Sequence, residues 1–162
     1  MSRYAVLVAA VLMAFIGLSR STESAEVTKF NDGPLKDLGL PFSESVRVGD
    51  VLFLSGVLGM TDDGKLAPGG MAAEADQAMQ NIADVLERRG LSMQDIVKCT
   101  VFLADISEWA AFNEVYKRYM KPPYPARSAL GANGLAENAR LEIECIAAYP
   151  EEPMKAPRQT PH

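Results

Sequence analysis

The spacing of hydrophobic residues predicts two amphipathic helices in the middle of the chain. Over residues 72–89 apolar side chains recur every three to four positions, which places them on one helix face, and Gly90 follows as a C-terminal stop. A second helix is predicted to begin after Asp105, with Glu108 as a capping box, and to end before Pro122. The apolar stripes are Ala75, Met79, Ile82, Val85 and Leu86 in the first helix and Trp109, Phe112, Tyr116 and Tyr119 in the second.

Short runs rich in β-branched and aromatic residues predict strands on both sides of these helices. The first two strands flank Gly49-Asp50, a tight-turn signal that is typical of a hairpin. Residues 26–43 contain two prolines and two glycines and are predicted to be loop-rich. The predicted strands cover residues 45–48, 51–55, 95–103, 127–130 and 140–148.

This order of elements predicts a single α+β domain in which a mixed sheet carries two helices on one face. The 162 residues suit one domain with a real hydrophobic core. Because the chain offers no further helices for the other face of the sheet, we expect that face to be covered by other copies of the protein.

Composition narrows the chemistry that the chain can perform. Its 48% hydrophobic and 23% charged residues are ordinary for a globular protein. The net charge of −5 counts against a nucleic-acid partner. The one histidine is the final residue, His162, which argues against imidazole-based catalysis and most zinc sites. We therefore expect no metal, and expect catalysis to rest on arginine, carboxylates, tyrosine, serine, backbone amides and water.

The N-terminal residues 1–25 are predicted to be a signal peptide. Arg3 precedes an uncharged stretch, residues 4–18, that is short for a membrane span. The alternatives are a buried core helix or an uncleaved membrane anchor. Cleavage would give a periplasmic or secreted protein with no membrane attachment, and the alternative location is the cytoplasm. Residues 26–150 would then form the domain and 151–162 a disordered tail.

The two cysteines, Cys99 and Cys145, both lie in predicted strands with apolar neighbours. Export would permit a disulfide between them. The pattern alone favours free buried cysteines that pack as small hydrophobic residues.

Two charged residues near the end of the domain are candidates for chemistry. Glu142 shares a strand face with Glu144. A carboxylate beside buried surface could deprotonate a water molecule. The alternative, which the pattern alone favours, is that this face is a solvated outer face of the sheet. Arg127 begins a strand after Pro125 and could grip a small carboxylate, although a surface ion pair is favoured for a lone arginine. Because Arg127 and Glu142 flank a predicted hairpin, we expect one cleft to hold both.

The run PARSALGANGLAENARLEIECIAAY, residues 125–149, resembles the signature of the RidA (YjgF-type) imine deaminases, a family also labelled endoribonuclease L-PSP. Similar blocks are VRVGDVLFLSG, QAMQNIADVLERRG, DIVKCTVFLAD and WAAFNEVYKRYM, so the resemblance spans about residues 40–149. It implies a chorismate-mutase-like fold and a homotrimer with clefts between subunits. It also implies hydrolysis of 2-imino or 2-enamino acids to 2-oxo acids and ammonia, without a cofactor.

The resemblance assigns roles to individual residues. Arg127 matches the residue that grips the substrate carboxylate, and Glu142 matches the one that positions water. Ser55 and Asn113 match polar positions that line the cleft. Two positions depart from the family pattern: Ala129 stands where many members have cysteine, and Phe42 stands where a tyrosine closes the site.

Other functions remain open at this stage. A non-enzymatic trimer could bind a small carboxylate through Arg127 without chemistry at Glu142, or act as a chaperone. A weak endoribonuclease is a further alternative, against which the acidic balance argues.

Overall fold

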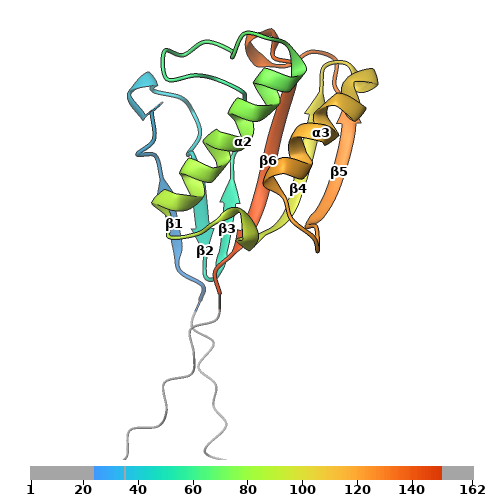
Figure 1. The fold of residues 1–162 in the computed structure, drawn as a ribbon. Coiled ribbons are helices and arrows are strands. Elements are labelled where there is room, and N and C mark those ends of the chain that lie inside the picture. The colour runs from blue at the N-terminus through green and yellow to red at the C-terminus, as the bar shows by residue number, and fades with distance from the viewer. Residues whose placement is uncertain (1–23, 35, 151–162) are drawn as a thin grey trace, which may run out of the picture.

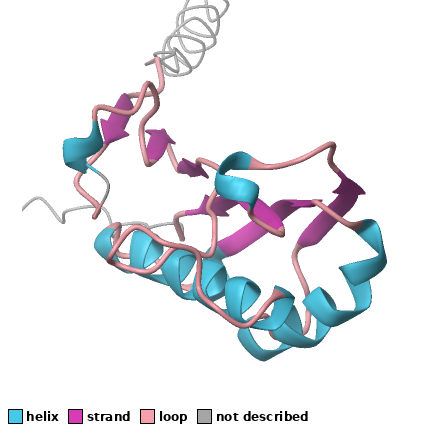
Figure 2. Cartoon of the chain, turned by 90° about the horizontal axis from the view of Figure 1, so that it is seen from above, coloured by secondary structure: helices cyan, strands magenta, loops and turns pink. Residues whose placement is uncertain are grey.

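A computed structural model describes residues 24–34 and 36–150 of the protein. A six-stranded mixed sheet carries two long helices on one face, as Figures 1 and 2 show. Four 3₁₀ turns cover Lys36–Leu38, Met93–Asp95, Ile106–Glu108 and Ala136–Asn138. The strands are β1 (Val27–Phe30), β2 (Ser45–Val48), β3 (Val51–Leu54), β4 (Ile96–Leu103), β5 (Ala126–Gly131) and β6 (Leu141–Ala148), and the helices are α2 (Met71–Arg88) and α3 (Trp109–Tyr119).

The order of strands across the sheet is β1-β2-β3-β6-β4-β5. Strands β4 and β5 are parallel, and every other neighbouring pair is antiparallel. Strand β6, the last along the chain, therefore lies in the middle of the sheet between β3 and β4. This insertion decides where the candidate residues lie.

The predicted elements are present, with two local differences. Residues 27–30, predicted to be loop, form β1, because pairing with β2 supplies backbone partners at the sheet edge that a weak local pattern does not reveal. At the start of the second helix, Asp105 accepts a hydrogen bond from the Ser107 backbone N–H and begins a 3₁₀ turn. The predicted capping role of Glu108 is absent; its carboxylate accepts a hydrogen bond from Arg140 at 2.7 Å.

The core lies between the helices and the face of the sheet that they cover. The predicted stripe of α2 is buried, as are Phe112 and Tyr116 of α3. Trp109 departs from its predicted stripe, because it begins α3 and is 45% exposed. The sheet contributes alternate residues of β6 to this core: Leu141, Ile143, Cys145 and Ala147.

Within the described residues, no helix covers the opposite face of the sheet. Figure 2 shows both long helices on the same side of the strands. Apolar side chains remain on the open face, with Phe53 44% and Leu130 43% exposed. Apolar surface of this kind is typical of an interface, which supports the expectation that other copies cover the sheet.

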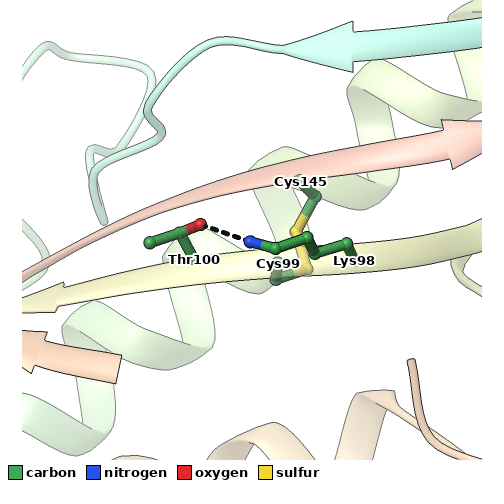
Figure 3. Close-up of a disulfide and its surroundings, with 4 residues drawn as sticks. All are labelled: Lys98, Cys99, Thr100 and Cys145. Atoms are coloured by element: carbon green, nitrogen blue, oxygen red, sulfur yellow. Dashed lines mark hydrogen bonds between the residues drawn. A yellow bond between two sulfur atoms is a disulfide. The ribbon is translucent and has the colours of Figure 1, made fainter. Parts of the chain in front are cut away.

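Cys99 and Cys145 form a disulfide, so the preference for free cysteines was wrong. They are directly paired residues of β4 and β6, with Cα atoms 4.1 Å apart, and both are 1% exposed (Figure 3). Burial was predicted correctly. The pairing follows from the insertion of β6 beside β4, which the spacing of the two residues along the chain does not indicate.

Removing this disulfide is expected to lower the free energy of unfolding by about 2–5 kcal/mol, because it closes a long loop in the unfolded chain. Chemical denaturation of the Cys99→Ala/Cys145→Ala variant and of wild type in strong reductant measures the loss in two ways. Equal midpoints for oxidised and reduced wild type would contradict a stabilising disulfide.

The predicted signal peptide lies outside the described residues except for its last two positions, and so does the predicted tail, residues 151–162. Among the helices that the structure describes, none combines the length and apolar character needed to cross a membrane.

Candidate functional site

Arg127 lies beside a cavity between β5 and α3. It pairs in register with Cys99 of β4, and Cys99 is buried in the core on the helix side of the sheet, so the Arg127 side chain also faces the helices. Pro125 fixes the chain immediately before the strand. The cavity has a volume of about 330 Å³ and is called the Arg127 cavity below. Its lining residues are Asn113, Tyr116, Lys117, Tyr124, Pro125 and Arg127.

Aromatic rings, rather than acidic groups, surround the Arg127 guanidinium. Its central carbon lies 4.6 Å from the ring centre of Tyr116, 5.6 Å from that of Phe112 and 6.0 Å from that of Trp109. At such distances the electron-rich faces of aromatic rings attract a cation. Within residues 24–34 and 36–150, no carboxylate forms an ion pair with Arg127. Its hydrogen-bonding fork is therefore available to an anionic ligand.

Tyr116 carries no charge that would cancel that of Arg127. Burial raises the pKa of the Tyr116 phenol, and the nearby Arg127 charge opposes that increase only in part. The phenol is therefore neutral at physiological pH and does not cancel the charge of Arg127. Sequence reasoning assigned Tyr116 to the core and missed its place in the cavity. Its spacing three residues after Asn113, on the same helix face, is the signal that could have found it.

Glu142 lies on the open face of the sheet, against the backbone of Gly56. It alternates with the buried residues of β6, as predicted. A Cβ atom added to Gly56 would lie 1.7 Å from Oε1 of Glu142. Paired backbone hydrogen bonds between Val57 and Ile143, at 2.9 and 3.0 Å, hold the two segments together. The carboxylate thus occupies space that only a glycine at position 56 leaves open.

Ser55 immediately precedes Gly56 along the chain, and Phe42 immediately precedes Ser43. The Ser55 hydroxyl donates a hydrogen bond to the Ser43 carbonyl at 2.6 Å, which ties the loop carrying Phe42 to the end of β3. The Phe42 ring is 52% exposed. Phe42, Ser55, Gly56 and Glu142 are called the Glu142 group below.

The single chain does not bring Arg127 and Glu142 together, and the predicted hairpin was wrong because β5 and β6 are not neighbours. Strand β4 separates β5 from β6, with Cys99 opposite Arg127 and Phe102 opposite Glu142. Strand spacing and rise place their Cα atoms about 14 Å apart. The two side chains also point to opposite faces, because Arg127 faces α3 and Glu142 faces away from it.

The two remaining candidates, Asn113 and Ala129, both lie on the helix side of the sheet. Asn113 lines the Arg127 cavity from α3. Ala129 lies on the Arg127 face of β5 and is half-buried against the core, and its side chain does not line the cavity. Within the part of the chain that the structure describes, no cluster of three or more His, Cys, Asp or Glu residues could hold a metal ion.

Comparisons with known proteins agree on one family. A family model described as Endoribonuclease L-PSP matches residues 37–149. A goat (Capra hircus) 2-iminobutanoate/2-iminopropanoate deaminase is 44% identical over 108 residues, 66% of this chain and 79% of its own length. The chloroplastic Reactive Intermediate Deaminase A of Arabidopsis thaliana is 35% identical over 83% of this chain and 71% of its own length.

A solved structure shares both the fold and part of the sequence. The crystal structure of E. coli TdcF with bound serine has a TM-score of 0.64 and is 32% identical, over 68% of this chain and 90% of that chain. The fold is therefore common to this chain and to a protein solved with bound serine.

Proposed function

This chain belongs to the Endoribonuclease L-PSP family, and we propose that it is a hydrolytic deaminase that converts 2-imino and 2-enamino acids to 2-oxo acids and ammonia. The resemblance to the RidA (YjgF-type) proteins and their α+β fold is confirmed. The observation that carries the proposal is the Arg127 guanidinium, which lies on aromatic rings beside a cavity with no acidic partner in the described chain.

The reaction needs few catalytic groups, because an imine carbon is already electrophilic. Arg127 holds the substrate carboxylate and so fixes the position of the imine carbon. Glu142 accepts a proton from a water molecule while the water oxygen bonds to the carbon of the protonated imine and the C=N electron pair moves to nitrogen. Glu142 then gives this proton to the nitrogen of the resulting carbinolamine, the C–N bond breaks, and the C=O bond forms as the hydroxyl loses its proton to Glu142. One water is consumed, and one 2-oxo acid and one ammonia leave.

The proposed site is complete only when two copies meet. Since Arg127 and Glu142 point to opposite faces of one chain, we assign the Arg127 cavity to one subunit and the Glu142 group to its neighbour. The exposed Phe53 and Leu130 on the open sheet face support burial between copies. A homotrimer with three clefts, as the resemblance implies, would bring Arg127 of one subunit to Glu142 of the next and would bury the open sheet face. Phe42 would close the cleft with its ring, and Ser55 and Asn113 would supply polar contacts.

The proposed location is an oxidising compartment reached by export. The buried Cys99–Cys145 disulfide supports it, because such bonds persist outside the reducing cytoplasm. A cytoplasmic location is the alternative. Mass spectrometry of the protein from its native cells identifies the N-terminal residue and shows whether Cys99 and Cys145 are oxidised. An intact N-terminus with two free thiols would contradict export.

Gly56→Ala tests the placement of the proposed base without removing it. The added methyl group displaces the end of a flexible side chain and leaves the surrounding backbone unstrained. We expect kcat for 2-iminobutanoate hydrolysis to fall about tenfold to hundredfold, because misplacing a catalytic group by about 1 Å has effects of this size. The melting temperature should change little. The imine is generated in place by an amino-acid oxidase, and its loss is followed by competition with semicarbazide.

The double variant separates positioning from a general structural defect. If Gly56 acts through Glu142, Gly56→Ala/Glu142→Gln will be no slower than Glu142→Gln alone. A double variant in which the two losses of kcat multiply would contradict the positioning role of Gly56. Absence of imine hydrolysis in the wild-type protein, together with cleavage of added RNA, would instead favour the endoribonuclease alternative.

A further inference from the structure

Among the described residues, the charges that line the Arg127 cavity are all of one sign. Arg127 and Lys117 are its charged lining residues, and the others are Asn113, Tyr116, Tyr124 and Pro125. This contrasts with the chain as a whole, which has 21 acidic and 16 basic residues. The cavity therefore offers two cations to a ligand, although a single carboxylate needs only one.

Lys117 is free to change its partner. It lies in the last turn of α3, four residues after Asn113, so both side chains project from the same helix face. Its ammonium lies 3.1 Å from Glu114, and these side chains are 58% and 77% exposed. An ion pair this exposed contributes little to stability, and the long lysine stem reorients readily. The Glu114 contact therefore leaves this ammonium available to a ligand carboxylate inside the cavity.

The volume of the cavity also indicates room for a ligand longer than a three-carbon acid. At about 330 Å³ it falls within the usual range for small-molecule sites, before any contribution from a neighbouring subunit. A three-carbon imino acid held at Arg127 would leave the Lys117 end of this space unused. A longer substrate with a second anionic group would reach both cations.

We propose that the preferred substrates are 2-imino acids with a second carboxylate on the side chain, with Arg127 holding the C1 carboxylate and Lys117 the side-chain carboxylate. This assignment rests on the proposed deaminase function and adds a substrate class to it. Lys117 is then a specificity residue that strengthens the binding of dicarboxylic substrates. It takes no part in the addition of water to the imine, which depends on Arg127 and Glu142.

Two stable product analogues test the assignment directly. 2-Oxopentanoate and 2-oxopentanedioate have the same carbon chain and differ only in a terminal methyl group or carboxylate. Each is used as an inhibitor of 2-iminobutanoate hydrolysis by the wild-type protein. We expect the dicarboxylate to bind about threefold to tenfold more tightly, as a partly exposed charge contact allows. In Lys117→Gln this preference should fall to about one, with the inhibition constant of the monocarboxylate unchanged.

Lys121→Gln is the matched control. Lys121 follows the same helix, but its ammonium donates to the Arg118 carbonyl at 3.3 Å and does not line the cavity. The Lys121→Gln protein should keep the full preference for the dicarboxylate. Equal binding of both inhibitors to wild type, or an undiminished preference in Lys117→Gln, would overturn the inference while leaving the deaminase function intact. A wild-type protein that hydrolyses no imine would instead contradict the deaminase function itself.

Discussion

Replacing Arg127 with alanine is expected to lower kcat/KM for 2-iminobutanoate by about 10²–10⁴-fold, because two charge-assisted hydrogen bonds to the substrate carboxylate are lost. The fold should survive, since Arg127 forms no ion pair within the described chain and its ring contacts contribute modestly. Arg127→Lys should retain intermediate activity, because an ammonium keeps the charge but lacks the planar fork. Steady-state kinetics with the oxidase-generated imine measure all three proteins.

Arg118→Ala is the control for this prediction. Arg118 lies on α3 and pairs with Asp76 at 3.1 Å, outside the Arg127 cavity. It should leave kcat/KM within about twofold of wild type. Unchanged activity in a folded Arg127→Ala protein would refute the assigned role.

Replacing Glu142 with glutamine is expected to lower kcat by about 10²–10⁴-fold, the usual contribution of a general base. The amide keeps the size of the side chain but does not accept the proton of the attacking water. KM should change much less, because Arg127 still holds the substrate. Glutamine at position 142 also avoids a volume change beside Gly56.

Glu144 provides a matched control on the same strand and face. It is exposed and lies two residues after Glu142. Glu144→Gln should keep near-wild-type kcat. A loss of similar size in both variants would indicate disruption of the shared sheet face instead of loss of a base.

Local patterns in the sequence predicted the elements well. The stripe of α2 and the alternation of β6 each depend on residues close together in the chain, and both are observed. Local patterns also placed Glu142 correctly on the face opposite the core. The family blocks pointed to Arg127, which does line a cavity.

Strand order was the part that the sequence could not supply. Whether β6 pairs with β5 or inserts beside β4 depends on long-range packing, and this choice separated Arg127 from Glu142. The same insertion placed Cys99 opposite Cys145, which overturned the expectation of free cysteines. Gly56 was missed for the same reason: its contact with Glu142 joins residues 86 positions apart.

A mixed assembly of two impaired proteins tests most directly whether the site spans two subunits. Arg127→Ala and Glu142→Gln proteins are denatured together in equal amounts and refolded. In a trimer whose sites each take Arg127 from one subunit and Glu142 from the next, about one quarter of the sites regain both groups by chance. Hydrolysis of 2-iminobutanoate should therefore return to about one quarter of the refolded wild-type rate. A rate no higher than that of either variant refolded alone would contradict a site shared between subunits.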